Sequence, residues 1–275
     1  PNMKSMPIID SHYTYDLKDK ISLATSCKDC DQVPKVSNAG NIVSENGQDF
    51  QVMHNGLKVL SGIYGGAGVR EIIKMLKGHH EPQEELIFHH LLASCSDDSV
   101  IVELGCWWSY YTLWYLKAKP NSKAISIEPE LTRLKIGIRN SEINQLQDRV
   151  NFIQGWCGTS EDGFKTVQRK PSCPEEIVPC YDYPRIEKEL GAQSVEVLHM
   201  DIQGGEVEII DSLANADKLP RFLVISTHHQ YITGNPNTHR ICLRKLEKLG
   251  ARILCQHSIE ESYSGDGLIV ASFGD

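Results

Sequence analysis

The sequence of 275 residues has no apolar run that approaches the roughly 20 residues needed to cross a bilayer. Its N-terminal part has no basic segment followed by an apolar stretch, so no secretory signal is visible. It also has no run of basic residues, and its 28 Lys and Arg against 36 Asp and Glu give a net charge of -8. Such a chain repels polyanions on average. We therefore expect a cytoplasmic protein with no nucleic-acid partner and no membrane partner.

The nine cysteines are odd in number and belong to a long chain, which argues against a disulfide framework. Several lie in apolar runs, as Cys255 does, and this is typical of reduced core thiols. Cys27 and Cys30 have the spacing of half a zinc site, but only Cys173 and Cys180 could complete it, and those two are spaced too widely for a second clip. We interpret residues 27–30 as a plain loop and assign no metal ligand.

The first 80 residues differ from the rest in pattern. Residues 1–50 are polar with few apolar residues in any period, which predicts an irregular or partly disordered arm. Clustered glycines at 62–68 mark a turn, and residues 69–76 have helical spacing. We expect residues 1–80 to form an N-terminal extension that acts as a lid or covers a substrate, and residues 81–275 to form the main domain.

Strand and helix patterns alternate from residue 81 onward, which predicts a parallel sheet covered on both faces. No helix-length segment separates the last two strands, so these should pair as an antiparallel hairpin. The stretch 158–182 shows no clear period. The fold class is therefore α/β, a seven-stranded, mostly parallel Rossmann-like sheet with an antiparallel last strand, plus the N-terminal extension. The predicted strands are 99–104, 123–128, 150–154, 195–200, 221–226, 251–255 and 268–272; the predicted helices are 84–93, 110–116, 131–144, 206–213 and 238–249.

The first candidate motif is the turn Glu103-Leu104-Gly105, which ends the first strand of this domain. Ligands of open α/β sheets bind beyond the carboxyl ends of the strands, and a glycine there lets the backbone approach them. The dinucleotide fingerprint has three spaced glycines, whereas this turn has one, so NAD and FAD are disfavoured. S-adenosylmethionine has no phosphate, and Glu103 can meet its amino group. A buried strand end that happens to have this sequence is the alternative.

Glu128 ends the second strand, and Pro129 stops that strand. An acidic side chain at this place can accept hydrogen bonds from both ribose hydroxyls of a nucleoside. Taken alone, Glu128 is equally a solvated strand end. Trp156 follows the third strand, where its ring could line an adenine pocket or pack in the core.

Asp201 ends the fourth strand, and the following Gly-Gly turn should point it at the centre of the cleft. We predict that Asp201 is the catalytic or substrate-positioning carboxylate, whereas Glu206, in the first turn of the next helix, is interpreted as a cap or dipole partner. His228 and His229 follow the fifth strand and could supply a base or join Asp201 at a metal. Adjacent residues of an extended segment point opposite ways, so at most one of the two histidines faces the cleft. We favour His228, and packing of both histidines in a loop is the alternative.

Two other histidine pairs, at 79–80 and 89–90, are interpreted as surface or interface positions in or near a helix.

Together these motifs resemble the FkbM family of methyltransferases over about residues 82–272. The matching segments are Glu103-Leu-Gly105 through Tyr110-Tyr-Thr-Leu113, Glu128-Pro129, Asp201-Ile-Gln-Gly-Gly-Glu206 and Ser226-Thr-His228. The chain departs from the family at Ser109, where a second glycine is usual, and at Trp107, where a small polar residue is usual. The loop over the methionine end of the cofactor is therefore expected to be reshaped.

The resemblance implies that residues 81–275 are a class I methyltransferase domain that uses S-adenosylmethionine. Its acceptor would be a hydroxyl of a sugar or of a polyketide- or peptide-like natural product. The alternatives are an NAD-dependent oxidoreductase and a catalytically inactive Rossmann-like binding module, and a homodimer is left open. The predicted catalytic residues are His228 and Asp201; the predicted cofactor-binding residues are Glu103, Gly105, Cys106, Ser109, Glu128, Pro129, Trp156 and Asp201.

Overall fold

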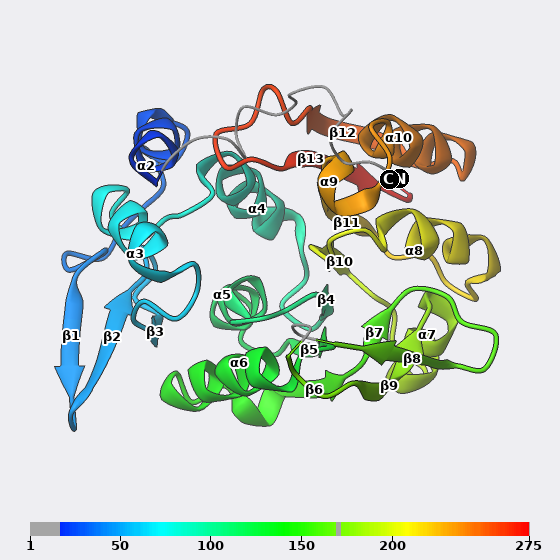
Figure 1. Cartoon of the computed structure of the whole chain (residues 1–275), viewed down its shortest axis with the longest axis horizontal. Helices are drawn as coiled ribbons and strands as arrows, with labels where there is room; N and C mark the ends of the chain where they lie inside the picture. The colour runs from blue at the N-terminus through cyan, green and yellow to red at the C-terminus, as the bar shows by residue number, and fades with distance from the viewer. Residues whose placement is uncertain (1–16, 169–171, 275) are drawn as a thin grey trace.

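A computed structural model describes residues 17–168 and 172–274 of the protein (Figure 1). Its centre is a seven-stranded sheet with the order β12-β13-β11-β10-β4-β5-β6. Neighbouring strands from β11 to β6 run parallel, and β13 pairs antiparallel with both β11 and β12. The predicted fold class and the terminal hairpin are confirmed. The strands are β4 (Val100–Leu104), β5 (Lys123–Glu128), β6 (Val150–Gln154), β10 (Val197–Met200), β11 (Phe222–Thr227), β12 (Arg252–His257) and β13 (Gly267–Ser272).

Helices cover both faces of this sheet (Figure 1). One face packs against α4 (Pro82–Ser94) and α5 (Tyr110–Ala118), and the other packs against α7 (Tyr183–Leu190), α8 (Glu206–Ser212) and α10 (Thr238–Lys248). α6 (Leu131–Ile143) lies beside β5 and β6. The period of two is visible in β4, where Val102 and Leu104 join one core cluster and Ile101 joins the other. Burial on both faces explains why the central strands are continuous apolar runs.

Residues 17–80 pack against this domain. They form α2 (Leu17–Ser26), a three-stranded antiparallel sheet of β1 (Ile42–Glu45), β2 (Gln48–Val52) and β3 (Lys58–Leu60), and α3 (Gly66–Met75). The expectation of an irregular arm is therefore wrong for residues 17–50, and residues 1–16 lie outside the described part. The strands are short and β1 is mostly exposed, so they give no apolar period that a sequence could reveal.

The contact between this segment and the main domain is apolar and polar at once. Met53 and Ile73 belong to the same core cluster as α4 and α5. Asn140 of α6 accepts a hydrogen bond from the backbone N–H of Leu60 at 2.9 Å. Asn144, at the C-terminal end of α6, accepts one from the backbone N–H of Lys58 at 3.0 Å. These contacts hold β3 against α6, and the division of the chain at residue 80 stays a prediction.

A second small sheet lies beyond β6. It has the order β7-β9-β8, with β7 (Trp156–Cys157), β8 (Phe164–Val167) and β9 (Glu176–Tyr181). Strands β8 and β9 lie in the stretch 158–182, for which the sequence showed no clear period. None of the helices in the described ranges is both long enough and apolar enough to span a membrane.

Candidate active site

A cavity of about 690 Å³ opens at the carboxyl ends of β4, β5 and β10. Its volume lies within the range of roughly 300–1,000 Å³ that is usual for small-molecule sites. Seven of the eight predicted cofactor-binding residues line the wall: Glu103, Gly105, Cys106, Glu128, Pro129, Trp156 and Asp201. The eighth, Ser109, is buried at the start of α5 and is absent from the wall, so the structure does not bring it to the cavity.

Glu103 lies in β4 and is 4% exposed. Its Oε2 atom accepts a hydrogen bond from the backbone N–H of Thr112 at 3.0 Å and a second one from the Thr112 hydroxyl. Burial raises the pKa of Glu103 to about 7, although these hydrogen bonds and the nearby His199 oppose the shift. The carboxylate is thus held in place by α5 while its own strand ends at the cavity.

Gly105 makes the turn that leaves β4, with a φ of 75°. A side chain is excluded here because a Cβ atom at Gly105 would collide with the backbone carbonyl of Asp201. The glycine therefore lets the ends of β4 and β10 approach each other. Trp107 follows with a φ of 37°, and its backbone N–H donates to Glu128 Oε2 at 3.3 Å, which ties this loop to the end of β5.

Glu128 is 3% exposed at the end of β5. Its Oε1 atom accepts a hydrogen bond from the backbone N–H of Glu130 at 3.0 Å. Burial raises its pKa, and its hydrogen bonds and Arg133 oppose that shift. Pro129 and Trp156 lie beside it in the wall. An acidic anchor and a flat ring are thus found together at this end of the cavity.

Asp201 and His228 are neighbours, as predicted, but only Asp201 lines the cavity. His228 is buried behind it, with Nε2 at 3.0 Å from Asp201 Oδ1 and 3.8 Å from Asp266 Oδ1. Burial lowers the pKa of His228, but the surrounding carboxylates outweigh burial and hold it well above its ordinary value. Burial raises the pKa of Asp201, and the charge of His228 reverses this and lowers it.

Glu206 completes this arrangement. It is fully buried, its Oε1 atom lies 2.5 Å from His228 Nδ1, and its Oε2 atom accepts a hydrogen bond from the Gly204 backbone N–H at 3.0 Å. The interpretation as a local cap describes only half of its contacts. Because the histidine comes from β11 and the glutamate from α8, their pairing could not be read from the sequence.

Four aromatic side chains also line the cavity: Tyr64, Trp107, Trp108 and Tyr111. Tyr64 comes from residues 17–80 and stacks on Trp108 with ring centroids 4.4 Å apart and planes 5° apart. The N-terminal segment therefore contributes directly to the cavity. No sequence pattern pointed to Tyr64, because it lies among turn-forming glycines.

The histidine pair at 79–80 is buried, so its interpretation as a surface position is wrong. His80 lines the cavity, with Nε2 at 3.1 Å from Glu81 and Nδ1 at 2.7 Å from Glu85. Burial lowers the pKa of His80, but the two carboxylates outweigh it and raise the pKa to about 10. The same Glu85 accepts hydrogen bonds from the backbone N–H groups of His80 and Glu81. The start of α4 is thus a buried charge network rather than a solvated helix end.

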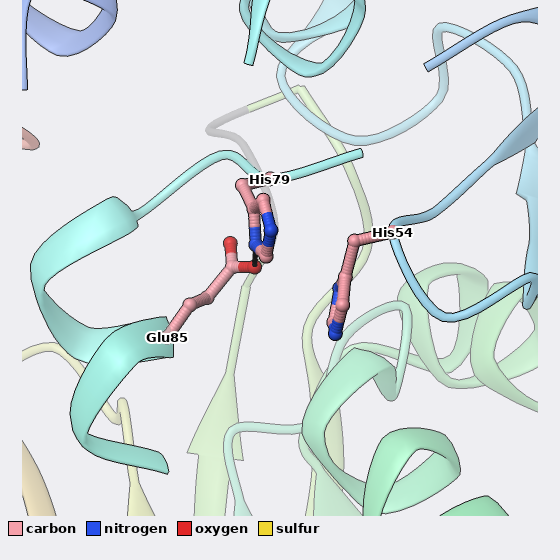
Figure 2. Close-up of side chains that lie close together, drawn as sticks. All are labelled: His54, His79 and Glu85. Atoms are coloured by element: carbon pink, nitrogen blue, oxygen red, sulfur yellow. Dashed lines mark hydrogen bonds and ion pairs between the residues drawn. The ribbon is translucent and has the colours of Figure 1, made fainter. Parts of the chain in front are cut away.

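His54, His79 and Glu85 form a possible metal cluster, since one ligand atom of each lies within 4.8 Å of the others (Figure 2). Their orientation does not suit an ion. The two imidazole rings are stacked, 4.2 Å apart and 18° from parallel, so their in-plane nitrogen lone pairs cannot converge on one point. His79 Nδ1 already contacts Glu85 at 2.5 Å, and His54 Nδ1 contacts the Tyr110 hydroxyl at 2.9 Å. The three side chains are a hydrogen-bonded, stacked part of the core.

Cys27 and Cys30 are buried free thiols, and the Cys30 thiol contacts the Pro82 carbonyl at 3.1 Å. They take no part in the His54 cluster. All nine cysteines are free.

The charge of the cavity wall is strongly one-sided. Arg133 is the only Lys or Arg among the described residues that line it, and its guanidinium lies over the Trp107 ring at 3.9 Å and pairs with Glu130 at 3.0 Å. Seven carboxylates of the described residues line the cavity: Glu81, Glu103, Glu128, Glu130, Glu176, Asp201 and Asp266. A site of this charge attracts cations and repels phosphates.

No protein-family model matches the sequence, and no curated protein matches it either. Similarity is found in the solved structures. A proposed rRNA-methylase from Clostridium thermocellum matches with a TM-score of 0.50 at 10% identity, over 68% of this chain and 93% of that one. An O-methyltransferase from Bacillus cereus, solved with SAH, has a TM-score of 0.46 at 15% identity, over 70% and 80% of the two chains. The fibrillarin/Nop5p complex has a TM-score of 0.47 at 13% identity, over 86% and 98%. At these identities the likeness concerns the fold alone.

Proposed function

We propose that this protein is an S-adenosylmethionine-dependent methyltransferase that methylates a hydroxyl of a small acceptor, either a sugar or a polyketide- or peptide-like natural product. One observation carries the proposal. Glu103, Glu128 and Asp201, which end three neighbouring strands, line a single cavity. Two acidic anchors for the ends of an adenosyl nucleoside thus lie on the same side of the sheet as a carboxylate for the acceptor.

The residues of the wall fit this cofactor. S-adenosylmethionine carries a sulfonium and an ammonium group, which suit a wall with seven carboxylates. Glu103 would accept from the ammonium group, Glu128 from the ribose hydroxyls, and Trp156 would lie along the adenine ring. The turn at Gly105 has no side chain that would keep the methionine end away from the backbone.

The chemistry supplied by the cofactor is a methyl group on a positively charged sulfur, which is already a good leaving group. The protein has to align the acceptor oxygen with that methyl carbon and keep water out. Asp201 faces the cavity and would accept the hydrogen bond of the acceptor hydroxyl, then its proton as the carbon–oxygen bond forms. His228 and Glu206 would act by holding the Asp201 carboxylate in this orientation.

The aromatic wall supports a role for the N-terminal segment at the acceptor. Tyr64 and Trp108 stack on each other in the wall of the cavity. Residues 17–80 would thus cover the acceptor and exclude water through Tyr64. Replacement of Tyr64 by Ala should raise the KM for the acceptor and leave cofactor affinity almost unchanged.

An NAD-dependent oxidoreductase is the main enzymatic alternative, and the charge of the wall disfavours it. The pyrophosphate of NAD would face seven carboxylates, and the sole lining Lys or Arg in the described ranges is already paired with Glu130. A catalytically inactive binding module is the second alternative. Isothermal titration with S-adenosylhomocysteine and with NAD, together with an assay for transfer of labelled methyl to an acceptor, separates the candidates. Only a methyltransferase should both bind S-adenosylhomocysteine and transfer the methyl group. Binding of NAD alone would refute the proposal.

A further inference from the structure

His199 lies in β10, directly opposite Glu103 of β4 in the sheet register. Both side chains therefore point to the same face of the sheet, and both line the cavity. His199 is 2% exposed, and its ring stacks on Tyr111 with centroids 4.2 Å apart. Neither the sequence motifs nor the proposed mechanism gives this histidine a role.

One nitrogen of His199 is fixed by the protein. Nε2 donates to Glu84 Oε1 at 2.7 Å, and Glu84 Oε2 accepts a hydrogen bond from the Ser226 hydroxyl at 3.0 Å. The other nitrogen, Nδ1, is buried and has no hydrogen-bond partner among the described residues. A buried polar atom without a partner is costly, so one at the wall of a cavity points to a bound ligand.

The state of this nitrogen decides what it binds. Burial lowers the pKa of His199, but the hydrogen bond to Glu84 and the charges of Glu84 and Glu103 raise it above its ordinary value. A protonated ring carries a hydrogen on Nδ1 as well, so Nδ1 would be a donor with positive charge.

The other cations that the described residues bring to the wall are already engaged. Both ring nitrogens of His80 face carboxylates, and Arg133 pairs with Glu130. A ligand carboxylate that enters this acidic cavity needs a cation, and among the lining residues that the structure describes His199 offers a ring nitrogen that no protein group uses. The ammonium and carboxylate of an α-amino acid share one carbon, so their partners must be neighbours, as Glu103 and His199 are.

We propose that His199 and Glu103 together bind the α-amino-acid head group of the cofactor, with Glu103 on the ammonium and His199 Nδ1 on the carboxylate. This rests on the proposed function. His199 would then be a specificity-determining residue that distinguishes the intact cofactor from nucleosides without an amino-acid carboxylate.

The test uses two matched variants and three ligands. The amide of glutamine can take the place of imidazole Nε2, so His199→Gln keeps the bond to Glu84 and loses the Nδ1 donor. The amide of asparagine can take the place of Nδ1, so His199→Asn keeps that donor and loses the bond to Glu84. The ligands are S-adenosylhomocysteine, its decarboxylated analogue, which keeps the ammonium, and methylthioadenosine, which lacks both groups.

Isothermal titration should show that His199→Gln weakens S-adenosylhomocysteine binding about 10- to 100-fold, as expected for the loss of a hydrogen bond to a charged group. The affinities for the decarboxylated analogue and for methylthioadenosine should change by less than about threefold. His199→Asn should bind S-adenosylhomocysteine more tightly than His199→Gln does. Circular dichroism verifies that each variant is folded.

Equal weakening of all three ligands by His199→Gln, or no weakening of any, would overturn the inference while the proposed function stands. Failure of the unmodified protein to bind S-adenosylhomocysteine would overturn both.

Discussion

The Nε2 atom of His228 lies 3.0 Å from Asp201 Oδ1, and only the aspartate reaches the cavity. A histidine at the end of β11 is thus placed behind the carboxylate rather than beside it. The sequence predicted both residues as catalytic, with His228 as a base and Asp201 as the catalytic or substrate-positioning carboxylate. The geometry supports an order in which the acceptor meets Asp201 and His228 positions that carboxylate from behind.

This order predicts how two substitutions differ. Asp201→Asn should lower kcat by about 100- to 10,000-fold, as expected for loss of a positioned proton acceptor. His228→Ala should lower kcat about 10- to 100-fold and change the Kd for S-adenosylhomocysteine by less than about threefold. Transfer of labelled methyl to an acceptor found by screening sugars and hydroxylated natural products measures kcat. His90→Ala, on the exposed side of α4, is the control. Full activity of His228→Ala would remove this histidine from the mechanism.

The pKa of Glu103, which burial raises to about 7, predicts a pH-dependent affinity for the cofactor. An acid is charged above its pKa, so the carboxylate needed for the ammonium group is mostly neutral near pH 6 and mostly ionised near pH 8. The affinity for S-adenosylhomocysteine should therefore rise between about pH 6 and about pH 8. Glu103→Gln should bind more weakly and lose this dependence. A parallel rise in the variant would show that another group titrates.

The buried pair of His80 and Glu85 predicts a window of stability against pH. The pKa of His80 is raised to about 10, so its contribution is complete below its unfolded pKa of about 6.5 and is lost as the pH rises toward 10. The pKa of Glu85 is held well below its ordinary value, because the charges of both neighbouring histidines outweigh burial, so its contribution is lost in acid. His80→Gln should cost about 2–4 kcal/mol near pH 6 and less near pH 9. Urea unfolding across this range measures the difference, and a cost that is constant with pH would contradict the charged state of His80.

The turn at Gly105 predicts a substitution effect with a matched control. Gly105 and Gly47 have similar φ angles, 75° and 77°, but a Cβ atom at Gly47 meets open space, whereas one at Gly105 meets the Asp201 carbonyl. Gly47→Ala should therefore cost only the backbone strain, about 1–2 kcal/mol. Gly105→Ala should cost more than this and should also abolish binding of S-adenosylhomocysteine. Unfolding and titration of both variants measure the two effects, and equal costs would show that the close approach of β4 and β10 is unimportant.

The succession of strands and helices along the main domain, and the site carboxylates at the strand ends, could be predicted because both depend on local pattern. A strand that is buried on both faces is a nearly continuous apolar run. A polar residue at its end therefore lies at the carboxyl ends of the strands, where ligands of such sheets bind. This is why Glu103, Glu128 and Asp201 were found from the sequence. The N-terminal segment and the strands β7 to β9 gave no such pattern, because their strands are short and partly exposed.

The sequence by itself thus determined the sheet and the carboxylates that surround the cavity, because period and burial are written in neighbouring residues. Only the tertiary structure decided which charged groups meet. Glu84 and His199 are 115 residues apart and come together because α4 packs on β10. Glutamate and histidine are residue types that are also common on solvated surfaces, so the sequence alone does not reveal that they are buried. Their burial depends on the elements that pack over them.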